Sequence, residues 1–284
     1  MRVRRPSTGL LAALVLAAPV LAGLGYVAAA SVGLTGVGAT GLTGERIRTV
    51  FGEPAVWRGL SWGLWAAGTS TLLATAAAVL IAALFRSSHR SDVVARALAI
   101  LPLPVPHLVA ATCAVLILGQ SGVVARIAAT AGWIHAPADM PALVYDRWGT
   151  GLILMLAWKE FPFLALIAIS LLATRGRALE ETARSLGARP GEVFRRVTWP
   201  ILWRGLAPAV VAVFTFVMGA YEGVALLAPS DPLALPLLTM ERFTDAALGR
   251  RADAYVLALL GLGVSALAVG LHEWARGRWE RLDP

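Results

Sequence analysis

The sequence predicts an all-α polytopic membrane protein with six transmembrane helices, from three observations. Of 284 residues, 58% are hydrophobic and 15% are charged, and the mean hydropathy is +0.71, whereas a soluble domain is nearer half apolar and a quarter charged. The apolar runs are about twice the ~10 residues of a membrane β-strand and do not alternate with polar residues. About 20 helical residues cross a bilayer, so the chain has room for about six spans. We expect a single membrane domain over residues 1–284.

Charged side chains delimit the expected spans, because an unpaired charge in hydrocarbon is costly. The runs with few or no charges give spans at about 9–30, 59–85, 97–119, 149–173, 206–228 and 254–272. The third span contains Pro102, Pro104 and Pro106, so we expect it to be broken or kinked, with freed carbonyls that find partners inside the bundle. The first span could instead be a cleavable signal peptide. Its apolar run exceeds the usual 7 to 15 residues, so we expect an uncleaved anchor.

The distribution of arginines predicts the orientation. Six spans place both termini on one side of the membrane. Sixteen arginines lie at the two termini, in the 86–96 hinge and in the 175–204 loop, and eight lie in the other loops. Because basic residues are enriched on the cytoplasmic side, both termini are expected there.

A segment rich in charge, residues 174–205, separates the fourth and fifth spans. Residues 180–186 contain good helix formers, and Gly187 followed by Pro190 supplies a stop and a turn. We expect a short helix before this turn.

A second short helix is expected from residue 191 to about 197. Val193, the aromatic Phe194 and Val197 would share its buried face, and Pro200 would end it. Two ordered helices of this kind suggest a docking element for a soluble partner. A basic loop that contacts anionic lipid is the alternative.

The loop also carries a specific spacing of residues. The matching positions are Glu181, Ala183, Gly187, Ala188, Phe194 and Pro200, and the departures are Thr182, Val197 and Trp199. This pattern resembles the EAA loop of inner-membrane permease subunits of binding-protein-dependent ABC importers. The similarity continues upstream over 158–163 and downstream over 219–227, so it covers roughly the third span to the C-terminus.

The resemblance implies a transport subunit of the bacterial inner membrane. Its coupling-helix loop would dock on a separate ATPase, with Glu181 pairing to a basic residue there. The implied partners are two ATPase subunits, a second permease (a copy or a paralogue), an extracytoplasmic solute-binding protein and membrane lipid. The similarity around 219–236 is to permeases for polyamines, ferric ion, thiamine and aminophosphonates.

The sequence contains no motif that would indicate covalent chemistry on this chain. The sole lysine, Lys159, lies between Trp158 and Glu160, so it cannot belong to a Gly-Lys-Ser/Thr phosphate-binding loop. We expect ATP and magnesium on the partner ATPase, and neither a catalytic residue, a metal site, a cofactor nor nucleic acid on this chain.

Two other function classes are alternatives. A secondary transporter would use intramembrane charges without an ATPase. An intramembrane serine protease would use Ser121 and His272, but the expected spans keep these residues about 30 Å apart.

Charged residues within the spans are candidates for the solute path, because ionisable groups at that depth are usually functional. Lys159, Glu160, Tyr221 and Glu222 could line the path, and its acidic groups would then favour a cationic solute. Alternatively, Lys159 could pair with Glu222 as a structural contact between the fourth and fifth spans.

Overall fold

The computed structural model describes residues 8–36, 39, 41–85 and 89–282, and all regular secondary structure in this part is helical. The main helices are α1 (Thr8–Ser31), α2 (Glu45–Gly52), α3 (Pro54–Leu84), α4 (Arg90–Ile100), α5 (His107–Leu118), α6 (Val123–Thr130), α7 (Thr150–Leu171), α8 (Arg177–Ser185), α9 (Pro190–Val193), α10 (Trp199–Met218), α11 (Glu222–Leu227), α12 (Leu235–Thr244) and α13 (Leu248–Leu282). Among the described residues, six helical stretches are long and apolar enough to cross a membrane. The prediction of an all-α, six-span protein is therefore confirmed.

The centre of the bundle is the contact between α3 and α7, with α10 packed on both. Small buried residues recur along α3, among them Ala67, Ala74 and Ala78, and they face large buried leucines of α7 such as Leu152 and Leu156. Apolar side chains gain little by leaving lipid, so close approach over small residues is what stabilises membrane helix pairs.

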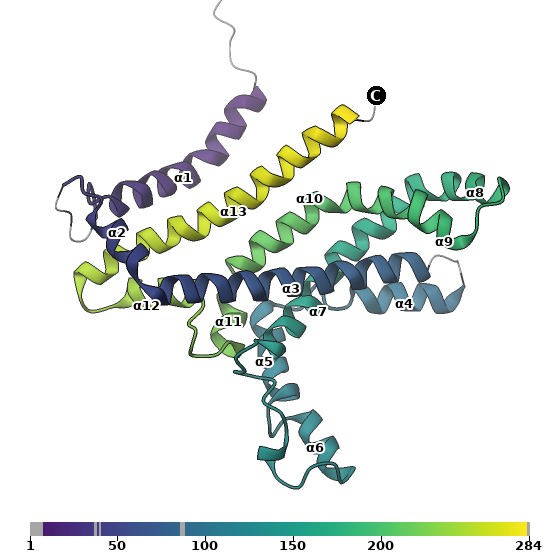
Figure 1. Ribbon diagram of the computed structural model, residues 1–284, viewed down its shortest axis with the longest axis horizontal. Helices are drawn as coiled ribbons and strands as arrows, with labels where there is room; N and C mark the ends of the chain where they lie inside the picture. The colour runs from purple at the N-terminus through teal and green to yellow at the C-terminus, as the bar shows by residue number, and fades with distance from the viewer. Residues whose placement is uncertain (1–7, 37–38, 40, 86–88, 283–284) are drawn as a thin grey trace, which may run out of the picture.

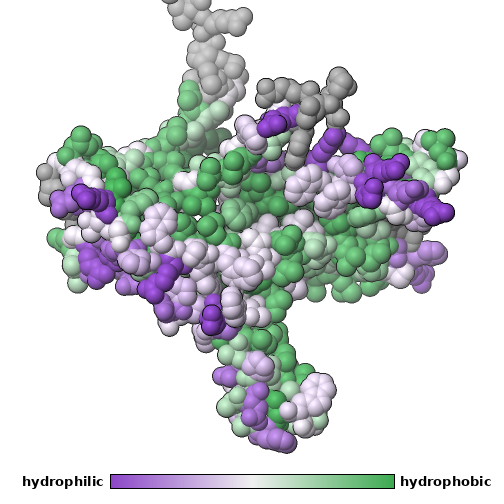
Figure 2. Space-filling view, in the orientation of Figure 1, coloured by the Kyte–Doolittle hydropathy of each residue, from purple (hydrophilic) through white to green (hydrophobic). Residues whose placement is uncertain are grey.

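The two ends of the bundle carry different elements. Figure 1 shows α2 and α12 at one end of the long axis and α8 and α9 at the other. On the face shown in Figure 2, strongly hydrophilic side chains gather toward both ends, with hydrophobic residues between them. We take the long axis as the membrane normal for α3, α7, α10 and α13, which run along it, whereas α5 and α6 project away from this axis (Figure 1).

Two of the spans are broken. The third divides into α4 and α5, with the three prolines in the turns between them, as predicted. The fifth was predicted to run unbroken over 206–228, and this was wrong. Helix α10 ends at Met218, and the amide of Gly219 caps it by bonding Thr215 and Phe216 carbonyls. Helix α11 then packs on α5 instead of continuing α10.

Two expectations about the second loop helix were also wrong. Pro200 does not end that helix, because the chain is helical from Pro190 to Met218. A π-helical turn at Phe194–Thr198 directly precedes α10, and such turns accommodate a local defect in the hydrogen-bond ladder. Phe194 is 39% exposed, and the neighbouring Val193, at 3%, is the residue that faces the interior.

Candidate functional site

The first candidate site is the turn between α8 and α9. Gly187 lies after α8 with φ of +87°, and an added Cβ there would meet no atom within 4 Å. The glycine is therefore required for its backbone conformation. Its amide bonds the Arg184 carbonyl, and the Ala188 amide bonds the Ala183 carbonyl, which closes the helix end. The stop expected at this glycine is confirmed.

Glu181 lies on the solvent side of α8. Its side chain is 62% exposed, and one oxygen accepts a hydrogen bond from Nε of Arg177 at 3.1 Å. An exposed ion pair of this type contributes about 1 kcal/mol or less, so a partner protein could displace Arg177 at little cost.

Sequence reasoning missed the adjacent residue, Glu180. Its side chain is only 5% exposed, its Oε1 accepts a hydrogen bond from the Thr198 hydroxyl at 2.5 Å, and Nη2 of Arg184 lies 3.6 Å from its Oε2. Thr198 directly precedes α10, so this buried contact connects the loop to a membrane span. The choice between two neighbouring glutamates depends on the rotational phase of α8, which the sequence pattern does not specify.

The second candidate site lies at the break in the third span. Lys159 and Glu160 are both buried, with 6% and 9% exposed. Lys159 Nζ donates to the Leu103 carbonyl at 3.1 Å, and Glu160 Oε1 lies 2.8 Å from His107 Nε2. Proline breaks the backbone hydrogen-bond ladder at this position. Two consecutive residues of α7 bind the chain there, Lys159 at Leu103 in the turn and Glu160 at His107, where α5 begins. The expectation that freed carbonyls find partners in the bundle is confirmed at Leu103.

The break in the fifth span lies beside the break in the third span. The His107 ring is 5.1 Å, centroid to centroid, from that of Phe216 near the end of α10. Tyr221 is 44% exposed, and Glu222 is also exposed, in the first turn of α11. In the part of the chain that the structure describes, Lys159 and Glu222 form no ion pair, so that alternative was wrong. The four candidate path residues divide into a buried pair and an exposed pair.

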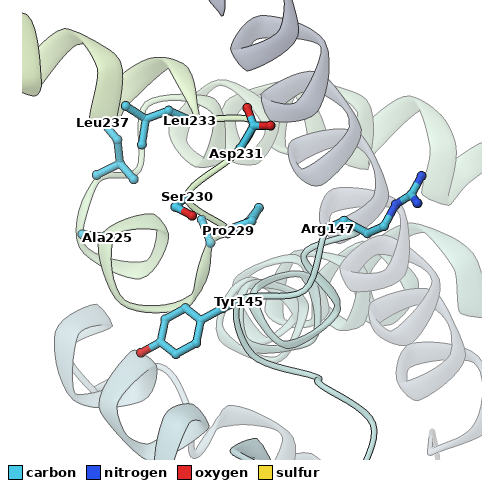
Figure 3. Close-up of a pocket in the computed structure, with 9 residues that line it drawn as sticks. Tyr145, Arg147, Ala225, Pro229, Ser230, Asp231, Leu233 and Leu237 are labelled. Atoms are coloured by element: carbon cyan, nitrogen blue, oxygen red, sulfur yellow. The ribbon is translucent and has the colours of Figure 1, made fainter.

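A cavity of about 510 Å³ opens at the end opposite α8 and α9. Figure 3 shows Ser230 and Asp231 of the α11–α12 connection above Tyr145 and Arg147, and the side chains of Tyr145 and Arg147 point to opposite sides. The indole N–H of Trp62 donates to the Arg147 carbonyl at 2.9 Å and so fixes this loop to α3.

The adjoining loop, between α6 and α7, is ordered by a carboxylate. Oδ2 of Asp139 accepts hydrogen bonds from the backbone amides of His135 and Ala136 at 2.8 and 2.9 Å. These two bonds lower the pKa of Asp139 below its ordinary value.

Comparison with known proteins shows the family in which these features occur. The family model of the binding-protein-dependent transport system inner membrane component matches residues 74–280, which include both broken spans and the α8–α9 turn. The chain belongs to this family. It is therefore the transmembrane permease component of a binding-protein-dependent ABC importer, an inner-membrane protein that is not itself the ATPase and binds no cofactor.

Several named relatives align with half or more of this chain. A probable molybdenum ABC transporter permease protein of Haloferax volcanii is 30% identical over 217 residues, 76% of this chain and 74% of that one. The molybdenum transport system permease protein ModB of Mycobacterium bovis is 29% identical over 257 residues, 88% and 90% of the two chains. A sulfate transport system permease protein CysT of Synechococcus elongatus is 30% identical over 152 residues, 51% and 53%.

A solved structure supports the fold. A bacterial ABC transporter involved in the import of the acidic polysaccharide alginate superposes with a TM-score of 0.74 at 17% identity, and the match covers 96% of this chain and 93% of that one. The named relatives correct the narrower expectation from sequence, because they are molybdenum and sulfate permeases and not permeases for polyamines, ferric ion or thiamine.

Proposed function

We propose that this permease imports a small tetrahedral oxyanion of the molybdate and sulfate class, with molybdate the first choice. The observation that carries the proposal is the similarity to ModB of Mycobacterium bovis, which extends over 88% of the chain. Molybdenum in neutral water is an oxyanion, so a molybdenum permease passes a dianion and not a metal cation.

The buried charges at the break in the third span are compatible with an anion. The sequence would favour a cation only if the acidic groups Glu160 and Glu222 lined the path. Glu160, however, is engaged by His107 and has Lys159 beside it in the chain. The buried cluster therefore presents no net negative charge, and Lys159 and Glu160 serve to hold the break between α4 and α5.

The solute path itself is proposed on the side of the protomer where Tyr221 and Glu222 are exposed. Two permeases, either two copies or a paralogous pair, would face each other across this side. A residue buried within one protomer cannot line a path between protomers, whereas the exposed pair can.

Coupling is proposed through the loop that contains Glu181, Ala183, Gly187 and Ala188. Two ATPase subunits would dock there, on the cytoplasmic side with both termini, and an extracytoplasmic binding protein would deliver solute at the opposite end. The contact of Glu180 with Thr198 would transmit movement of α8 to α10. Phe194 is exposed beside the turn, so it is available to the ATPase, and Pro200 begins the span that would move.

Competition for uptake tests the choice of solute. In proteoliposomes containing the permease, its ATPase and its binding protein, labelled molybdate should accumulate. Excess tungstate, of nearly the same size and charge, should abolish uptake, and excess sulfate should reduce it. Uptake of a polyamine or of ferric ion, with no uptake of molybdate, would contradict the proposal and leave the permease assignment intact.

A further inference from the structure

An aromatic pair marks the outer face of α10 where this span begins. The rings of Trp199 and Trp203 stack with centroids 5.9 Å apart and planes 18° apart. The two side chains are 41% and 39% exposed, while Leu202 and Leu206, on the opposite face, are at 0% and 1%. The indoles therefore lie on the side of α10 away from the bundle core.

Two arginines precede this pair by about one helical turn. Arg195 and Arg196 are both exposed, in the π-helical turn that leads into α10. Neither forms an ion pair with any residue that the structure describes, nor does either indole N–H have a hydrogen-bond partner there. The face thus presents two uncompensated positive charges and two free N–H donors.

The position of this face along α10 places it at the level of the lipid headgroups. From residue 201 to 218 the only charged residue in the sequence is Arg204, so the hydrocarbon region begins close to Trp203. Tryptophans are enriched at the level of the lipid headgroups, and arginines one turn beyond would lie at the level of the phosphates. Guanidinium groups bind phosphate through paired hydrogen bonds.

We propose that Arg195, Arg196, Trp199 and Trp203 form a binding site for the phosphate headgroup of an anionic phospholipid. The arginines would bind the phosphate, and the stacked indoles would cover the glycerol and donate their N–H groups to its ester oxygens. A soluble ATPase could contact the arginines but not the indoles, because the indoles lie on the membrane-spanning part of α10. The site is separate from the solute path and does not depend on the identity of the solute.

Native mass spectrometry of the purified permease–ATPase complex tests the site. The wild-type complex should retain phosphatidylglycerol in preference to phosphatidylcholine. The double variant R195Q/R196Q should bind phosphatidylglycerol at least about tenfold more weakly, since each arginine near an anionic lipid contributes about fivefold to the affinity. R195K/R196K, which keeps the charges but not the paired hydrogen bonds, should be intermediate. The matched control is Arg189→Gln, an exposed arginine of the same loop without a neighbouring tryptophan, which should bind as the wild type does.

Two results would overturn the proposal. One is equal retention of the two lipids by the wild-type complex, a measurement that needs no variant to fold. The other is unchanged binding of phosphatidylglycerol by R195Q/R196Q. If that variant instead lost the ATPase subunit while it kept the lipid, the face would be part of the ATPase contact.

Discussion

At the scale of single residues, two buried glutamates connect segments that lie apart in the chain. Glu160 contacts His107, which is 53 residues away, and Glu180 accepts a hydrogen bond from Thr198, which lies beyond the turn. Only the fold brings these residues together. Glu160 was recognisable from the sequence because it interrupts an apolar run, whereas His107 was not recognisable as its partner.

Removal of His107 should weaken both stability and transport. His107→Ala leaves the Glu160 carboxylate buried without its partner, which costs about 1–3 kcal/mol for a buried polar group and more for a charge. We expect a lower thermal unfolding midpoint and a several-fold lower uptake rate. His107→Gln, which can still donate a hydrogen bond, should recover much of both. Wild-type stability and uptake in His107→Ala would show that the contact does not hold the break.

Charge reversal at Glu181 should separate docking from folding. Glu181→Lys places a positive charge where a basic residue of the ATPase is expected, and repulsion in a desolvated interface can cost several kcal/mol, whereas loss of an exposed pair costs about 1 kcal/mol. Membrane insertion should be normal for both Glu181→Lys and Glu181→Gln. Solute-stimulated ATP hydrolysis should be lost in the lysine variant and largely kept in the glutamine variant. Equal activity of the two would argue against a charged contact at this position.

At the scale of elements, the spans were predictable because charges limit them, and the break in the third span was predictable because prolines cause it. The break in the fifth span was not, since no proline marks it and α11 packs on α5, a helix distant in the chain. The continuous helix through Pro200 was missed for a related reason. A π-helical turn has no sequence signal comparable to that of a proline.

Two glycines of similar conformation should respond differently to substitution. Gly187 and Gly149 have φ of +87° and +70°, but an added Cβ meets nothing at Gly187 and lies 2.7 Å from Trp62 Cζ2 at Gly149. Alanine at either site costs about 1–2 kcal/mol of backbone strain, and overpacking adds about 1–3 kcal/mol at Gly149. Gly149→Ala should therefore lower the unfolding midpoint of the detergent-solubilised protein clearly more than Gly187→Ala. Equal shifts would show that the loop yields to the added methyl group.

At the scale of the whole molecule, composition and the lengths of the apolar runs predicted the six-span, all-α architecture, and a short loop motif predicted the family. The solute could not be predicted in this way, because the proposed path lies between protomers and its lining depends on which side chains remain exposed. Orientation rests on the two-to-one excess of arginine at one end.

Labelling of single cysteines tests that orientation. In a Cys113→Ala background, Arg189→Cys should be protected from a membrane-impermeant thiol reagent in intact cells, because α8 and α9 are expected in the cytoplasm. Ala138→Cys and Ser230→Cys should react, since the loops that contain them are expected on the extracytoplasmic side. The same reagent applied to permeabilised cells is the control that Arg189→Cys is reactive. Labelling of Arg189→Cys from outside would reverse the topology and remove the proposed ATPase contact.

The energy source of uptake tests the central claim most directly. Molybdate uptake should be measured in proteoliposomes that contain the permease, its ATPase and the binding protein, with ATP inside the vesicles or with an imposed ion gradient alone. The account predicts accumulation with ATP, none with a gradient alone, and none when either the ATPase or the binding protein is omitted. Accumulation driven by an ion gradient through the purified permease without its ATPase would contradict it.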